Sequence, residues 1–114
     1  MKLQISELEH GIRLITLQGK LDSNGVYNVE VDFIRHCGVD GTHVLVDLSK
    51  VSYISSVGIP MLIHDAKLVM ERGRKLALLN PNRNVLEVLE IVGASHIIPV
   101  FYDLKDAKAG MAVY

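Results

Sequence analysis

The chain has 114 residues, 49% of them hydrophobic, and 12 basic against 13 acidic side chains give a formal net charge of −1. This length suits a single domain over residues 1–114, and the balanced charge excludes nucleic-acid binding through a strongly basic surface. The apolar runs are far shorter than the roughly 20 residues that cross a bilayer, and residues 1–7 contain no signal-peptide core. A single cysteine, Cys37, excludes an internal disulfide and fits a reducing cytoplasm. Together with the short apolar runs, it leads us to expect a cytoplasmic protein without a membrane span.

The first two elements are predicted to be strands, over residues 2–8 and 11–18. They form a hairpin whose turn, at residues 9–11, places Gly11 at its tight position. Residues 19–23 are predicted to be a loop.

A helix is predicted to follow this loop, with Asp22 or Ser23 as its N-cap. Its apolar residues recur at steps of three and four, as an amphipathic helix requires: Val26, Val29, Phe33 and Ile34. It should end near Cys37, where residues 38–41 interrupt the pattern.

The centre of the chain is a β-branched apolar run over residues 43–48, typical of a strand that is buried on both faces. A polar loop is predicted over residues 49–56 and a helix over residues 57–72, with Gly73 as a left-handed C-cap. One side of this helix carries Met61, Leu62, Leu68 and Val69.

The remaining elements continue the alternation of strand and helix. They are a strand over 75–79, a helix over 82–92 that stops at Gly93, a strand over 97–101 and a short helix that Asp103 or a neighbour opens. This order predicts an α/β fold in which an N-terminal β-hairpin precedes βαβαβα units, with a mixed, mostly parallel sheet flanked by helices. Loops 19–23 and 49–56 should then lie side by side, beyond the carboxyl ends of their strands.

Ser56 is the residue most suited to regulation, because it stands where a helix begins. We expect its hydroxyl to cap that helix by accepting from the N–H of Gly58 or Ile59, while Gly58 allows another backbone to approach closely. A phosphate on Ser56 would add about −1.5 to −2 charges, which a helix N-terminus tolerates and a docked partner does not. The plain alternative is that Ser56 is a cap and nothing more.

The chain resembles the STAS family, in particular the bacterial anti-sigma factor antagonists. The residues that carry the resemblance are 19–22, 44–48, 51–59, 73–80 and 85–89. The resemblance implies partner switching. The unphosphorylated antagonist binds a GHKL-type serine kinase that is also the anti-sigma factor, phosphorylation releases it, and a metal-dependent serine phosphatase restores it.

The family's acceptor serine matches Ser56, and its neighbouring loop aspartate matches Asp22. The family usually has an aspartate before the acceptor, where this chain has Ser55, so Ser55 is the second candidate for the modified residue. Val57 also replaces a smaller or hydroxylated residue. The expected partner-binding residues are Asp22, Ser23, Ser55, Ser56, Val57, Gly58 and Met61.

Other functional classes find less support in the sequence. The histidines show no metal-ligand spacing, and no hydrolase elbow, P-loop or dinucleotide motif is present, so we expect neither a metal, nor a cofactor, nor an enzyme. Asp47 is expected to have a structural hydrogen-bonding role, and His64 and Asp65 are expected to face water or a partner. The alternative function is a STAS scaffold or adaptor in a signalling or transport complex that is never phosphorylated.

Overall fold

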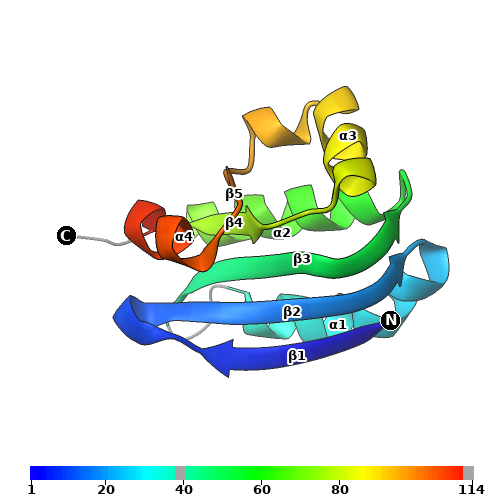
Figure 1. Ribbon diagram of the computed structural model, residues 1–114. Helices are drawn as coiled ribbons and strands as arrows, with labels where there is room; N and C mark the ends of the chain where they lie inside the picture. Colours follow the sequence, from blue (N-terminus) through cyan, green and yellow to red (C-terminus); the bar gives the residue numbers. More distant parts are fainter. Residues whose placement is uncertain (38–40, 112–114) are drawn as a thin grey trace.

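A five-stranded sheet in the order β1-β2-β3-β4-β5 forms the centre of the computed structural model, which describes residues 1–37 and 41–111 (Figure 1). The strands are β1 (Lys2–Glu7), β2 (Ile12–Leu21), β3 (His43–Ile54), β4 (Leu76–Leu79) and β5 (Val100–Phe101). β1 pairs antiparallel with β2, and every other neighbouring pair is parallel. The predicted α/β class and mostly parallel sheet are therefore confirmed.

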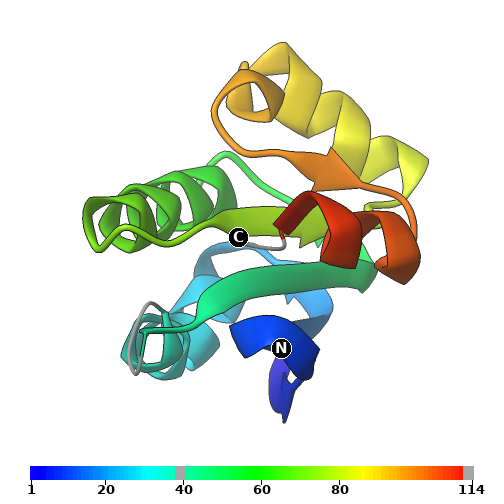
Figure 2. The same cartoon turned by 90° about the vertical axis from the view of Figure 1, so that its left-hand side faces the viewer.

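Helices cover both faces of the sheet, and the alternation of side chains in β3 explains how. Val44 and Val46 belong to the larger apolar core, under α1 (Ser23–His36), α2 (Gly58–Glu71) and α3 (Arg83–Ile91). Leu45 points to the opposite face, where it packs in a smaller core with α4 (Leu104–Met111). Figure 2 shows α1 and α2 on one side of the sheet and α4 on the other. In the part of the chain that the structure describes, no helix is long and apolar enough to cross a bilayer.

Several predicted helix ends are confirmed by their backbone geometry. Gly73 has a φ of 75°, and its N–H donates to the Met70 carbonyl 2.9 Å away, as a left-handed C-cap residue does. Asp103 precedes α4, and its Oδ1 accepts from the N–H of Asp106 at 2.7 Å. The predicted break after the first helix lies partly outside the described residues, since α1 ends at His36 and residues 38–40 are not described.

The two predicted loops are wrong in extent, because the strands before them continue. Gly19 to Leu21 belong to β2, and Ser49 to Ile54 belong to β3. The pairing persists through two register shifts, at one of which Asp47 Oδ1 accepts from the Ser49 N–H at 2.9 Å. The exposed polar residues of this segment interrupt the apolar pattern, so the sequence alone does not predict that the strand continues. Asp47 has the structural hydrogen-bonding role expected of it.

The predicted strand over residues 97–101 is also wrong in extent, because only Val100 and Phe101 are extended. A short 3-10 helix, η3 (Ala94–His96), comes first, and the Ala94 carbonyl accepts from the N–H groups of Ile97 and Ile98. Pro99 follows and has no N–H to donate. The N–H groups of Ile97 and Ile98 therefore have hydrogen-bond acceptors without a longer β5.

Candidate functional site

The candidate site lies where β2 and β3 end next to each other. Leu21 and Ile54 are the last residues of these strands, and they are register partners. The Leu21 carbonyl accepts from the Ser55 N–H at 3.0 Å and from the Ser55 hydroxyl at 3.4 Å. The parallel pairing thus brings together two segments 34 positions apart, as expected for the two polar loops.

Asp22 directly follows this junction and opens α1. Its Oδ1 accepts from the N–H of Gly25 at 2.9 Å, and its carbonyl accepts from the N–H of Val26 at 2.9 Å. Asp22 is therefore the N-cap of α1, which leaves Ser23 as the exposed first residue of the helix. The carboxylate also suits the positive end of the helix dipole.

The serine turn, residues 55–58, joins β3 to α2, and its half-buried member is Ser55. The Ser55 hydroxyl accepts from the N–H of Val57 at 3.2 Å, and the Ser55 carbonyl accepts from the N–H of Gly58 at 3.1 Å. Ser55 therefore holds both the end of β2 and the start of α2. This is the local serine turn by which a hydroxyl satisfies backbone two residues ahead.

The prediction that Ser56 caps α2 is wrong. The N-cap position is Val57, whose φ of −79° and ψ of −33° are helical, and no side chain caps the helix. Capping by a hydroxyl needs an extended residue at that position. Ser56 is exposed, and its hydroxyl makes no hydrogen bond with any described residue. It is an unengaged alcohol that another protein can reach.

Gly58 confirms the expected close approach at the start of α2. A Cβ at this position would lie 2.7 Å from both the Cγ atom and the carbonyl oxygen of Leu21. Real side chains do not make such contacts, so glycine is what lets α2 begin against the end of β2. This packing places the serine turn beside Asp22.

The two apolar residues predicted to bind a partner differ in exposure. Val57 is 46% exposed, whereas Met61 is only 6% exposed. Both line a pocket of about 340 Å³ between α1 and α2, the α1–α2 pocket. Its other walls include Val26, Glu30, His64 and Asp65. Met61 is therefore part of the wall of the α1–α2 pocket, next to the serine turn.

Of the two residues expected to face water or a partner, His64 is exposed, whereas Asp65 is buried and does not face water. Asp65 is 2% exposed; its Oδ1 lies 3.1 Å from the Nδ1 of His64, and its buried Oδ2 has no hydrogen-bond partner. Burial raises the pKa of the Asp65 carboxyl; the hydrogen bond and charge of His64 oppose this shift, and the nearby Glu30 charge adds to it.

A signal for this burial was present in the sequence. Asp65 follows Met61 by four positions and precedes Val69 by four, so it lies on the buried face of α2. Among residues 1–37 and 41–111, no group of three potential metal ligands comes together, so the carboxylates of the pocket do not form a metal site.

The family model that matches the chain is that of the STAS domain, over residues 5–107. BtrV of Bordetella bronchiseptica, named for anti-sigma factor antagonism, is 30% identical over 96% of this chain and 93% of its own. The anti-sigma F factor antagonist of Paenibacillus polymyxa is 27% identical over 99% of this chain and 98% of its own.

Solved structures show the same fold. The anti-sigma factor antagonist SpoIIAA in its unphosphorylated form has a TM-score of 0.79 at 15% identity, covering 99% of both chains. The phosphorylated form of SpoIIAA from Bacillus has a TM-score of 0.70 at 16% identity, covering 96% of this chain and 99% of that one. The family model covers most of the chain and the fold agrees with these structures, so the chain belongs to the STAS domain family.

Proposed function

We propose that this protein is a cytoplasmic anti-sigma factor antagonist that works by partner switching, with Ser56 as the residue that is phosphorylated. The observation that carries the proposal is the contrast within the serine turn. Ser56 is exposed and its hydroxyl has no hydrogen-bond partner in the described part of the chain, while the Ser55 hydroxyl is held by Leu21 and Val57. The names of the two sequence relatives support the function.

In the proposed cycle, the unphosphorylated protein docks on an anti-sigma factor that is also a GHKL-type serine kinase. The kinase transfers the γ-phosphoryl group of ATP to Ser56 Oγ, which loses its proton, and ADP is the other product. A metal-dependent serine phosphatase later hydrolyses the phosphoester to serine and inorganic phosphate. This chain acts as a binding protein and a substrate, and the two partners carry out the chemistry.

The added charge explains how one modification could separate the partners. A phosphate brings about −1.5 to −2 charges to the start of α2, where the helix dipole favours an anion. Because Ser56 makes no bond that the fold needs, the domain should stay folded. An interface that fits a neutral hydroxyl loses complementarity when it must accept that charge.

The experiment is to incubate the protein with its cognate kinase and ATP and to map the product by mass spectrometry. We expect phosphate on Ser56, no phosphate on the Ser56→Ala variant, and continued labelling of a Ser55→Ala variant. Phosphate on Ser55 alone would contradict the assignment. Binding to the kinase that ATP never changes would favour the scaffold or adaptor instead.

A further inference from the structure

Another pocket of the molecule, the α2–α4 pocket, lies at the opposite end of α2 from the serine turn. Its volume is about 290 Å³, and its lining includes Met70 near the end of α2 and Gly110 and Met111 at the end of α4. Nearly the whole length of α2, roughly 18 Å, separates Met70 from Gly58. A ligand bound here would therefore leave the serine turn free for a partner.

The α2–α4 pocket exists because β5 is too short to cover the whole edge of β4. β5 pairs with the second half of β4, at Leu78 and Leu79. Among the described residues, no strand lies on that side of the first half, Leu76 and Ala77. Leu76 belongs to the larger core and Ala77 to the smaller core on the other face of the sheet, yet both line the pocket. The pocket is therefore at the edge of the sheet, between the ends of α2 and α4.

The lining of this pocket is mostly apolar, and part of it is open to water. Met70 is 47% exposed and Ile97 is 43% exposed, while Phe101 and Met111 are more buried. Exposed apolar side chains that gather around one hollow are typical of a binding site, whereas single ones are ordinary. The unbranched methionine side chains adapt to a flexible guest, and the volume is at the lower end of the range for small-molecule sites, about 300–1,000 Å³. A short aliphatic chain fits this pocket better than a bulky cofactor does.

Lys75 supplies the one charge of the described lining, and it is exposed. Its Nζ donates to the Gly110 carbonyl at 3.5 Å, which engages one of the three donors of the ammonium. Burial lowers the pKa of His43, and the charges of Arg74 and Lys75 lower it further. The Nδ1 of His43 accepts from the Lys75 N–H at 2.9 Å, so these groups share one corner of the fold. The electrostatic potential at the start of β4 is therefore positive, and a carboxylate complements it.

We propose that the α2–α4 pocket binds a medium-chain fatty acid, with its alkyl chain against Met70, Ile97 and Phe101 and its carboxylate paired with the Lys75 ammonium. Burial of the alkyl chain drives binding, and the carboxylate stays beside an exposed lysine, where water still solvates it. The inference goes beyond the proposed function and does not rest on it, because the pocket and Ser56 lie at opposite ends of α2.

The first test is a titration of sodium octanoate into protein with isotope-labelled methionine methyl groups, followed by NMR. The chain has four methionines, of which Met70 and Met111 line the α2–α4 pocket. Met1 and Met61 do not line it and serve as internal controls. We expect saturable shifts at the first two alone, with an affinity that rises about fourfold for each CH₂ group added between hexanoate and octanoate. Equal shifts at all four methionines, or no shifts, would overturn the proposal.

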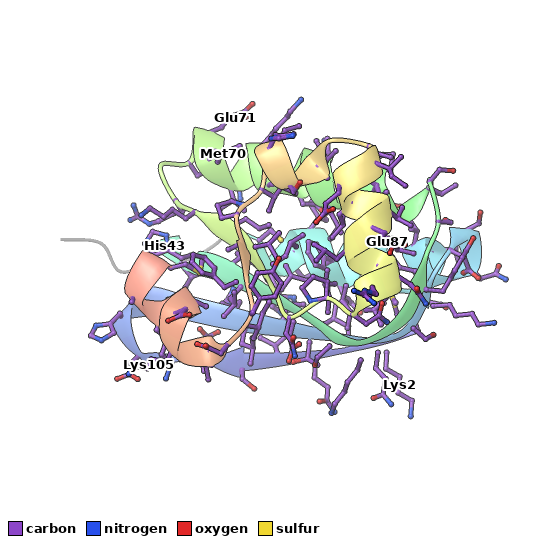
Figure 3. All side chains as sticks on the ribbon, turned by 45° about the horizontal axis from the view of Figure 1, so that its top comes forward. Lys2, His43, Met70, Glu71, Glu87 and Lys105 are labelled. Atoms are coloured by element: carbon purple, nitrogen blue, oxygen red, sulfur yellow. The ribbon has the colours of Figure 1, made fainter. Side chains whose placement is uncertain are left out.

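The second test measures the affinity of octanoate for variants of the pocket. Lys75→Gln should weaken octanoate binding about threefold, as expected for an exposed ion pair, and should leave the binding of neutral 1-octanol unchanged. Lys105→Gln is the matched control, because Lys105 is exposed in α4 and does not line the pocket (Figure 3). Ile97→Glu should abolish octanoate binding through repulsion, whereas the neutral Ile97→Gln should retain part of it. Both changes are at an exposed position, so both variants should fold.

Two results of the variant series would overturn the proposal. If Lys75→Gln binds octanoate as tightly as wild type and Lys105→Gln do, the carboxylate is not paired with Lys75. If octanoate does not bind and sedimentation shows a dimer that Ile97→Glu dissociates, a second copy of this chain covers the pocket instead. Phosphorylation of Ser56 is measured separately, so the pocket assignment and the switch can each fail while the other stands.

Discussion

Two adjacent serines of this chain are in opposite situations. Ser55 donates to the Leu21 carbonyl and accepts from the Val57 N–H, so its hydroxyl is part of the fold. Ser56, one position later, is exposed, and its hydroxyl makes no hydrogen bond to any residue that the structure describes. A hydroxyl at position 55 can donate to a carbonyl, which an ionised aspartate cannot do. Ser55, which stands where an aspartate is usual in the family, therefore makes a hydrogen bond to Leu21 that an ionised aspartate could not make.

A Ser56→Asp substitution tests the charge at the proposed acceptor. We expect the affinity for the kinase to fall by about tenfold or more, because a carboxylate replaces a neutral hydroxyl at the interface. The melting temperature should change by less than about 4 °C, since the exposed hydroxyl supports nothing else. Calorimetry of binding and of unfolding measures the two effects.

The control for that variant is Ser56→Asn, which matches the size of aspartate without its charge. It should bind the kinase much more tightly than Ser56→Asp does. Equal weakening by both substitutions would mean that size, and not charge, disrupts docking.

Asp65 should make stability depend on pH in a direction unusual for a carboxyl group. Burial raises its pKa against the opposing contact with His64, so the folded protein holds this proton more tightly than the unfolded chain does. The contribution of Asp65 to the stability of the wild type therefore falls as pH rises from the unfolded pKa, about 3.9, through the higher folded value.

An Asp65→Asn variant removes this titration. We expect it to be more stable than the wild type at pH 7 and to lose that advantage on acidification below the unfolded pKa. Thermal unfolding across this pH range, with Glu71→Gln as the control, measures the difference. A wild type that gains stability over Asp65→Asn as pH rises would contradict the sign.

At the scale of elements, the position of α2 depends on how closely it starts against β2. The missing Cβ of Gly58 makes room for Leu21, whose side chain is fully buried in the core. The same junction holds the serine turn and Asp22. A shift of α2 would therefore move Ser56, Val57 and one wall of the α1–α2 pocket together.

Gly58→Ala is expected to lower the free energy of unfolding by about 2 kcal/mol, because the added methyl group overlaps Leu21. It should also weaken kinase binding, since it displaces the serine turn. Gly73→Ala is a useful control: a Cβ there meets nothing within 4 Å, and only the positive φ of 75° opposes it. That variant should lose about 1 kcal/mol and bind normally. Urea denaturation and a binding assay distinguish the two.

At the scale of the whole molecule, one core joins nearly every element. The larger apolar core includes residues of β2, β3, β4 and all three helices on its face, with Phe33, Leu62 and Leu89 fully buried at its centre. The helices that carry the site therefore depend on the same packing as the sheet. We expect the domain to unfold in one cooperative step.

Leu62→Ala tests this dependence. We expect a loss of about 3 kcal/mol in the free energy of unfolding, from buried surface and the cavity that remains. The transitions followed by circular dichroism and by tyrosine fluorescence should coincide. A separate early transition for the helices would show that they unfold independently of the sheet.

Periodicity in the sequence determined the order and type of the elements, and hence the fold class. Val26, Val29 and Phe33 lie on one helix face, and the run at residues 43–48 belongs to a buried strand, because burial imposes these spacings. The resemblance also led to Ser56 and Asp22. Local patterns could predict these helices and strands because each pattern depends on residues within a few positions of one another.

Only the tertiary structure decided the roles of the two serines, the full length of β3 and the burial of Asp65. Strand pairing with residues 18–21 extends β3 past a polar segment, and the Leu21 carbonyl engages Ser55 across 34 positions. Asp65 is buried because α1 and α2 pack against each other on the same face of the sheet. These contacts join residues far apart in the chain, and a local pattern contains no information about which distant group will lie opposite.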